Sequence, residues 1–145
     1  MTRSSVITQG VKITAQCEAC GGVLIRDTGQ FIDRDQLWWG TEGRCLSCPV
    51  AWCEQDSGGE TPEEIRQAIL AEHGPARLRL TEPVASPVAV LRALREVHTL
   101  TLAQARSTAD QLRTTGLIGT LVEMELVASR LRHHSVGATI DPEPR

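Results

Sequence analysis

The chain has 145 residues, 41% of them hydrophobic and 23% charged, and its formal net charge at pH 7 is -3. This composition is close to that of average globular domains and excludes a disordered or collagen-like chain. No apolar run is long enough for a membrane-spanning helix or for the apolar segment of a signal peptide, so we expect a cytoplasmic protein with no membrane partner.

Charged and aromatic residues divide the chain near its middle. Residues 1–75 carry six basic and 11 acidic side chains, whereas residues 76–145 carry nine basic and seven acidic ones. All five cysteines and all three tryptophans also precede residue 54. We therefore predict an α+β protein with two domains, 1–75 and 76–145.

Two hairpins are predicted in the first domain, each with a pair of cysteines at its tip. Short segments alternate between apolar and polar side chains, which is typical of strands. The predicted segments are 11–15 and 22–26 around the turn 17–21, then 37–39 or 43–44 leading into the turn 45–49, with 50–53 leaving it.

A helix is predicted over residues 62–73. Thr61 is placed to cap its first turn, Pro62 suits the first helical position, and Glu64 completes a capping box three residues after the cap. Gly74, followed by a proline, ends this helix. The first domain is therefore expected to be a β structure followed by one helix.

The second domain shows the order strand, helix, helix, strand, helix, strand. Two further capping boxes begin with Thr101 and Thr120. The predicted strands are 78–82, 117–118 and 138–140, and the predicted helices begin at Ser86–Pro87, Thr101 and Thr120. On the first of these helices, the spacing of Val90, Leu94 and Val97 places them on one apolar face.

The four cysteines of the two predicted turns have the spacing of a zinc site. Cys17-x-x-Cys20 and Cys45-x-x-Cys48 each let one tight turn aim two thiolates at a single tetrahedral ion. Disulfides need an oxidising compartment, and we expect a cytoplasmic protein. A thioredoxin-type redox pair needs one such motif at a strand-to-helix junction, whereas this chain has two motifs in predicted hairpins. We therefore predict a structural zinc ion in a zinc-ribbon-like domain that is too small to fold on its core alone.

Cys53 and the tryptophans each have two interpretations. Cys53 is predicted as a buried small hydrophobe beside Trp52, and the alternative is a ligand that replaces one cysteine of the second pair.

The tryptophans are expected in the core, because the chain has one phenylalanine and no tyrosine. Trp38 and Trp39 point to opposite faces of a strand, so one of them can be exposed. The alternative for exposed tryptophans is base stacking.

Residues 88–106 read VAVLRALREVHTLTLAQAR. This stretch resembles the C-terminal domain of the bacterial ribosomal large-subunit stalk protein, the seven/twelve protein. Residues 77–141 follow that family's order of elements, and Gly137-Ala138 matches its glycine-alanine before the last strand. The resemblance implies a small β-α-α-β-α-β sandwich with three helices on one face of a three-stranded sheet. The same fold occurs in the Clp protease adaptor, and neither relative is an enzyme.

In the stalk family, the start of the first helix and basic residues on the first two helices bind translational GTPases. The resemblance implies a partner-binding surface at the matching positions, which are Val88, Ala89, Leu91, Arg92, Arg95 and Arg106. Pro87, Glu96 and Ala103 depart from the basic residue, the glycine and the lysine of the family. The alternative is a solvated helix face on which Arg92 pairs with Glu96.

We therefore expect a non-catalytic, zinc-binding protein-interaction module rather than an enzyme. Its partner would be a translational GTPase, a ribosomal component or a basic protein. The acidic charge of the first domain supports the basic partner. The chain would then cover the basic surface of that partner, as an antitoxin, immunity or adaptor protein does. A nucleic-acid-binding zinc ribbon is the alternative, which the charge opposes because Lys and Arg supply most phosphate contacts. His98, His133 and His134 are expected to be exposed or locally hydrogen-bonded.

Overall fold

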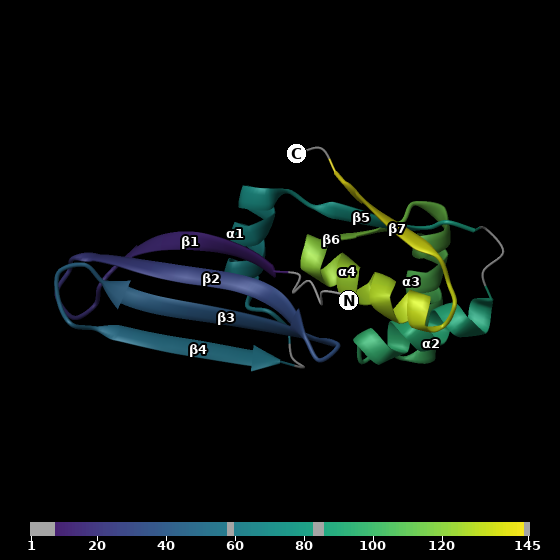
Figure 1. The fold of residues 1–145 in the computed structure, drawn as a ribbon, viewed down its shortest axis with the longest axis horizontal. Coiled ribbons are helices and arrows are strands. Elements are labelled where there is room, and N and C mark those ends of the chain that lie inside the picture. The colour runs from purple at the N-terminus through teal and green to yellow at the C-terminus, as the bar shows by residue number, and fades with distance from the viewer. Residues whose placement is uncertain (1–7, 58–59, 83–85, 144–145) are drawn as a thin grey trace, which may run out of the picture. The chain divides into compact units, whose positions relative to one another are not determined.

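The chain forms two compact units, Met1–His73 and Gly74–Arg145, and the computed structural model describes residues 8–57, 60–82 and 86–143. Within these residues the first unit contains a four-stranded antiparallel sheet and one helix, and the second a three-stranded antiparallel sheet and three helices (Figure 1). The predicted α+β class is therefore confirmed. The division lies two residues before the predicted boundary between residues 75 and 76.

The first sheet is a meander in which each strand pairs with the next one along the chain. Its strands are β1 (Thr8–Gln16), β2 (Val23–Asp33), β3 (Gln36–Cys45) and β4 (Ala51–Ser57). No local pattern in the sequence predicts the hairpin between β2 and β3, which turns at Arg34 and Asp35. Both residues adopt left-handed backbone, with φ of 50° and 61°. They lack the glycine or asparagine that normally signals a two-residue turn of this kind.

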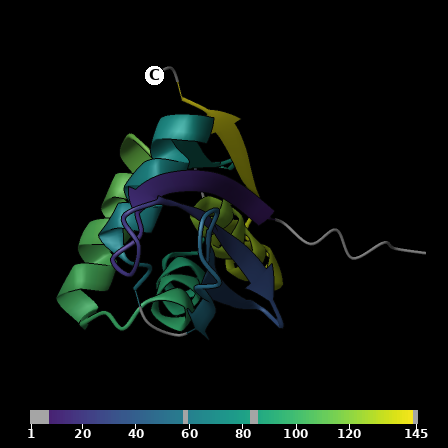
Figure 2. The same cartoon turned by 90° about the vertical axis from the view of Figure 1, so that its left-hand side faces the viewer.

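The helix α1 (Glu63–His73) packs against one face of this sheet, mainly against β1 (Figure 2). Ile65 and Ile69 are buried and form a hydrophobic cluster with Trp39, against which Val11 also packs. This cluster is small, so it supplies only part of the stability that the unit needs.

Polar side chains also join the start of α1 to the sheet. The fully buried amide of Gln30 donates a hydrogen bond of 2.8 Å to Oγ1 of Thr61. Nη1 of Arg26 donates to Oε1 of Glu64 at 2.9 Å. The helix begins at Glu63, one residue after the predicted start. Thr61 and Glu64, which the sequence predicts as a capping box, thus bind the start of the helix to the sheet.

The second unit has the order of elements that the sequence predicted. Its elements are β5 (Ala76–Leu80), α2 (Pro87–Val97), α3 (Leu102–Thr114), β6 (Leu117–Gly119), α4 (Leu121–His133) and β7 (Ala138–Pro142). The middle strand is β5, which pairs with both β6 and β7. It begins two residues before the predicted strand, because Ala76 pairs with Gly119 on one side and Pro142 on the other.

Both predicted capping boxes of this unit are formed. Oγ1 of Thr101 accepts from the N–H of Gln104 at 3.1 Å, and Oε1 of Gln104 accepts from the N–H of Thr101 at 2.9 Å. Thr120 and Glu123 make the same pair of bonds, also at 3.1 and 2.9 Å. Because the first turn of a helix leaves N–H groups without intrahelical partners, these bonds fix the starts of α3 and α4.

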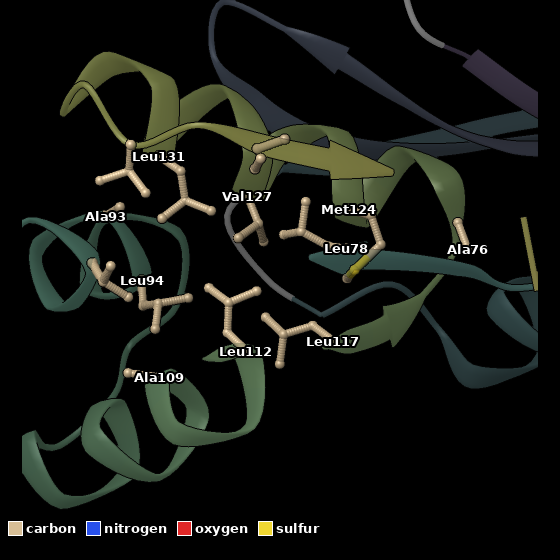
Figure 3. Packing of buried hydrophobic residues seen from close by; sticks show 14 residues of the cluster. Ala76, Leu78, Ala93, Leu94, Ala109, Leu112, Leu117, Met124, Val127 and Leu131 are labelled. Atoms are coloured by element: carbon tan, nitrogen blue, oxygen red, sulfur yellow. The ribbon is translucent and has the colours of Figure 1, made fainter. Parts of the chain in front are cut away.

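One hydrophobic core joins the sheet and the helices of the second unit. Side chains from β5, α2, α3 and α4 point toward the same interior (Figure 3). Its most deeply buried large side chains include Leu78, Val90, Leu94, Leu112, Val127 and Leu131. Val90 and Leu94 confirm the predicted apolar face of α2, and Val97 packs against the same core.

Candidate metal centre

The two cysteine turns lie at the same end of the first sheet, on the left in Figure 1, because alternate turns of a meander share an end. Sγ of Cys17 lies 3.8 Å from Sγ of Cys48, and Sγ of Cys20 lies 3.4 Å from Sγ of Cys45. All four sulfur atoms lie within 4.8 Å of one another. The structure therefore brings together the four cysteines that the spacing singled out.

These distances fit a metal ion bound by four sulfurs. A tetrahedral site with metal–sulfur bonds of about 2.3 Å has sulfur–sulfur edges of about 3.8 Å. The two short distances each join sulfurs from different turns. One ion at the centre would therefore contact both hairpins.

Main-chain hydrogen bonds shape both turns. In the first turn, the N–H of Cys17 donates to the C=O of Gly22, and the N–H of Gly21 donates to the C=O of Cys17, both at 2.8 Å. Gly21 has a φ of 74°, which glycine adopts without the strain of a side chain. In the second turn, the N–H of Cys45 donates to the C=O of Val50 at 2.9 Å. Each turn therefore holds its cysteines through its own main chain.

Main-chain N–H groups also point at sulfur atoms of the cluster. Gly22 donates to Sγ of Cys20, and Ser47 donates to Sγ of Cys45, each at 3.3 Å. The bond from Ser47 lowers the pKa of Cys45 to about 6, because it stabilises the thiolate. At Cys48 a main-chain N–H also lowers the pKa, but partial burial and hydrogen bonds with the other cysteines outweigh it and raise the pKa to about 12. A bound metal ion would displace such protons, since cysteine binds metals as thiolate.

The four cysteines differ in their exposure to solvent. Cys17 is buried, Cys45 and Cys48 are half-buried, and Cys20 is exposed. Four sulfur ligands fill every position of a tetrahedral ion, whereas catalytic metal sites keep one position for water or substrate. The arrangement can therefore hold the two hairpins together around an ion.

Cys53 does not belong to this cluster, so the alternative in which it replaces a ligand is wrong. It lies within β4, where it pairs with Glu42 of β3. Each strand residue advances the chain by about 3.3 Å, and β4 therefore carries Cys53 away from the turn that contains Cys48. Its side chain is exposed, which also corrects the prediction of a buried small hydrophobe.

The three tryptophans occupy different environments. Trp39 is buried against α1, whereas Trp38 is half-buried and stacks on Phe31 with ring centroids 6.2 Å apart. Trp52 is 40% exposed, so the expected core position is wrong for this residue. Its ring covers Gly43, where an added Cβ atom would lie 2.6 Å from the ring atom Cε2. The sequence carries no signal for this packing, because it depends on the register between β3 and β4.

The expected partner-binding residues differ in exposure. Val88, Arg92 and Arg95 on α2 and Arg106 on α3 are exposed. Ala89 and Leu91 are half-buried and pack against the core of the second unit. The cationic side chains of the expected surface are therefore accessible, while two of its three apolar members also serve the core.

Glu96 pairs with Arg130 of α4 and with His134, which directly follows α4. This corrects the expected pairing of Glu96 with Arg92. A hydrogen bond of 2.7 Å joins its Oε1 to Nε2 of His134, and its Oε2 lies 3.9 Å from Nη1 of Arg130. The bond with His134 holds the pKa of Glu96 below its ordinary value. Because 38 residues separate Glu96 from His134, no local pattern predicts the pair.

Three apolar residues in or beside the cysteine turns are exposed without any signal for it in the sequence, namely Val23, Leu46 and Val50. Apolar residues in or beside a short strand are more often buried than exposed. Their exposure follows from their place at the end of the sheet, which only the folded chain reveals.

No helix among the described residues has both the length and the apolarity that a bilayer crossing requires. Comparison of the chain with protein-family models, with curated proteins and with solved structures finds no match.

Proposed function

We propose that the protein is a non-catalytic, zinc-binding module that interacts with another protein. The observation that supports this most directly is the cluster of four cysteine sulfurs at one end of the first sheet. Four thiolates in tetrahedral geometry suit zinc, and a full set of protein ligands leaves no position for a substrate. The role of the ion is then structural.

A structural ion also compensates for the small apolar core of the first unit. The hydrophobic cluster beneath α1 consists of Trp39, Ile65 and Ile69, with Val11 packed against it. Structural zinc sites supply folding free energy directly, on the order of 10 kcal/mol in small domains. We therefore infer a zinc-ribbon-like domain in which the ion joins the two cysteine turns.

Metal analysis of the purified protein tests this inference. We expect one zinc ion per chain in the wild type and none in Cys17→Ser. Cys53→Ser is the matched control, because Cys53 lies outside the cluster, and it should keep the full zinc content. Four-sulfur sites also suit iron, so iron is measured on the same samples. Iron in place of zinc, or a first unit that stays folded after chelation, would contradict a structural zinc ion.

The second unit supports the interaction part of the proposal. Its order of elements is the one that the resemblance to the ribosomal stalk domain implies. Arg92, Arg95 and Arg106 are exposed, as is the apolar side chain of Val88. We infer that these residues dock an anionic protein surface, with a translational GTPase or a ribosomal component as the first candidate.

Charge reversal tests this docking surface. The double variant Arg92→Glu/Arg95→Glu should keep its stability within about 0.5 kcal/mol, because both side chains are exposed. Its binding to a purified bacterial translational GTPase should be lost, because like charges would face each other. Arg79→Glu, at an exposed position on β5, is the matched control. Wild-type binding by the double variant would exclude the surface.

A further inference from the structure

The strand β4 forms one edge of the first sheet, because it pairs with β3 alone (Figure 1). An edge strand presents main-chain N–H and C=O groups that have no partner strand, and many proteins block such an edge with proline, lysine or a bulge. β4 contains neither proline nor lysine. Its register with β3 continues without a bulge from the pair Trp38 and Ser57 to the pair Arg44 and Ala51. The main chain of β4 is therefore regular enough to pair with another strand.

The other edge strand of this sheet, β1, is partly covered. The helix α1 packs against β1, and Nε2 of His73 donates a hydrogen bond of 2.8 Å to the C=O of Gly10. On β4, six of the seven residues are exposed, and the N–H of Ser57 at its end donates to Oδ1 of Asp56 at 2.7 Å. Of the two edges, β4 is therefore the more accessible to an incoming strand.

Three side chains form a row along one face of β4. Trp52, Glu54 and Asp56 share this face, because alternate residues of a strand point the same way. Asp56 pairs with Trp39 of β3, which is buried against α1, and Glu54 pairs with Thr41. Neither carboxylate forms an ion pair with another described residue. A cation can therefore approach both carboxylates from the open side of β4. We call this open side, with the three side chains of the row, the β4 edge.

Trp52 is the apolar end of the row. Its ring covers Gly43, and it is 40% exposed. Cζ of Arg26 lies 6.0 Å from the ring centroid, and Arg26 is bonded to Glu64 of α1 at 2.9 Å. Because a cation already lies over this ring, the side chain of an incoming strand that best fits beside Trp52 is apolar.

The charges of the β4 edge oppose two other occupants. Residue 54 is the middle of β4, so antiparallel pairing of two copies along their full length would place Glu54 opposite Glu54 of the second copy. Like charges directly opposite each other destabilise a sheet. The carboxylates also repel nucleic-acid phosphates. A strand with basic side chains removes both objections, because it forms cross-strand pairs of opposite charge.

We propose that the β4 edge binds an extended segment of another protein, which adds to the sheet as a further antiparallel strand. Two arginines or lysines of that segment, two positions apart, face Asp56 and Glu54, and an apolar side chain two positions further along packs beside Trp52. In such strand addition the main chain supplies affinity, and alternate side chains supply selectivity. The proposal goes beyond the proposed function, because it assigns a second surface, on the first unit, and the chemistry of its partner.

Labelled synthetic peptides test the β4 edge through fluorescence anisotropy with the full chain, loaded with zinc. The probe carries arginine, arginine and leucine at alternate positions from its N-terminus, separated by threonines. One control peptide has the same composition with the arginines adjacent, so that they point to opposite faces, and another has glutamate in place of arginine. We expect the probe to bind, the reordered peptide to bind several-fold more weakly and the glutamate peptide to stay free.

The main chain of the peptide provides a sharper test. Methylation of alternate amide nitrogens removes the donors from one edge of a strand and keeps its side chains. We expect one alternate set of methyl groups to abolish binding and the other set to leave it unchanged, because only one edge of the peptide faces β4. Amide hydrogen exchange should also slow in β4 when the probe is bound, since its open N–H groups gain partners.

Substitutions in the chain locate the surface. Glu54→Gln and Asp56→Asn should each weaken binding of the probe by roughly two- to fivefold and reduce its dependence on salt. The double variant Glu54→Lys/Asp56→Lys should prefer the glutamate peptide. Glu42→Gln is the matched control, because Glu42 is exposed on β3 and pairs with Cys53, on the opposite face of the sheet. It should bind the probe as the wild type does.

Equal affinity for the ordered and reordered peptides, or binding that survives both sets of methyl groups, would overturn the proposal. An equal loss of affinity in Glu42→Gln would do the same. The proposal also fails if the wild type self-associates in sedimentation and the protection of β4 depends on that association, because the occupant is then a second copy. Zinc content is measured on every sample. A wild-type chain without zinc overturns the proposed function, whereas a zinc-loaded chain that ignores the probe overturns the β4 edge alone.

Discussion

The Sγ atoms of Cys17 and Cys48 lie 3.8 Å apart, although 31 residues separate these cysteines along the chain. Cys17 opens the turn that follows β1, and Cys48 lies in the turn that precedes β4. A metal ion bound between them would therefore tie the first hairpin of the sheet to the last one. The loss of a single ligand would release both hairpins at this end.

Cys17→Ser should unfold the first unit and leave the second one folded. Structural zinc supplies about 10 kcal/mol or more, which is comparable to the whole stability of a small domain. All three tryptophans lie in the first unit, so their fluorescence reports on that unit alone. Circular dichroism follows the helices of the second unit in the same sample.

Cys53→Ser is the control for this prediction, since it removes a thiol that lies outside the cluster. Its fluorescence and zinc content should match the wild type. A Cys17→Ser chain with wild-type tryptophan emission would show that the sheet and α1 are stable without the ion.

Residues 74–145 expressed alone should fold cooperatively. They contain all the elements of the second unit and the whole of its hydrophobic core, from Ala76 to Ala138. Helical circular dichroism with one sharp thermal transition is the expected result. A disordered fragment would mean that the second unit needs the first one for its core.

The pair of Glu96 and His134 should make the stability of the second unit depend on pH. The hydrogen bond with His134 lowers the pKa of Glu96, and the charges of Arg130 and His133 act in the same direction. A carboxyl group whose pKa is lower in the folded state stabilises the fold above its unfolded pKa. This contribution is lost as the pH falls through the folded pKa. Glu96→Gln should therefore lower the melting temperature at neutral pH. As the pH is lowered, the melting temperature of this variant should fall less than that of the wild type.

The expected difference is below about 1 kcal/mol, because the pair lies near the surface. Thermal unfolding of residues 74–145 between neutral pH and a pH of about 3 measures it. Glu125→Gln, on the same helix as Arg130, is the control and should keep the acid sensitivity of the wild type. Identical pH profiles for wild type and Glu96→Gln would show that this bond contributes nothing in solution.

The features predicted from sequence are those with short-range signals. The capping boxes at Thr101 and Thr120 depend on residues three apart, and both are formed. The four clustered cysteines lie in two short motifs, whose turns were recognisable without knowledge of the sheet. The start of each helix and the composition of each cysteine turn depend on residues a few positions apart, so neighbouring residues in the sequence are enough to predict them.

The features that were missed depend on contacts between distant residues. Trp52 lies on Gly43 because β3 and β4 pair in one register, and a shift of one residue would place it elsewhere. Glu96 meets His134 because α2 and α4 pack together. Cys53 is excluded from the cluster by the direction of β4. None of these follows from neighbours in the sequence.

The β2–β3 turn was missed for a different reason, and it leads to a prediction about stability. Arg34 and Asp35 adopt left-handed backbone between the paired residues Asp33 and Gln36. This conformation costs an ordinary L residue about 1–2 kcal/mol, and asparagine tolerates it better. Arg34 is exposed, so replacing it tests the backbone rather than a side-chain contact. Arg34→Asn should therefore stabilise the first unit by about 0.5–1 kcal/mol.

The opposite substitution, Arg34→Val, should destabilise the same unit by about 1–2 kcal/mol, because a β-branched side chain fits left-handed backbone poorly. Chemical unfolding followed by tryptophan fluorescence compares the two variants with the wild type at constant zinc. The order Asn, Arg, Val in decreasing stability supports a two-residue turn with positive φ at Arg34. Equal stability of the Asn and Val variants would contradict it, because only an extended or helical backbone at this position accepts both residues alike.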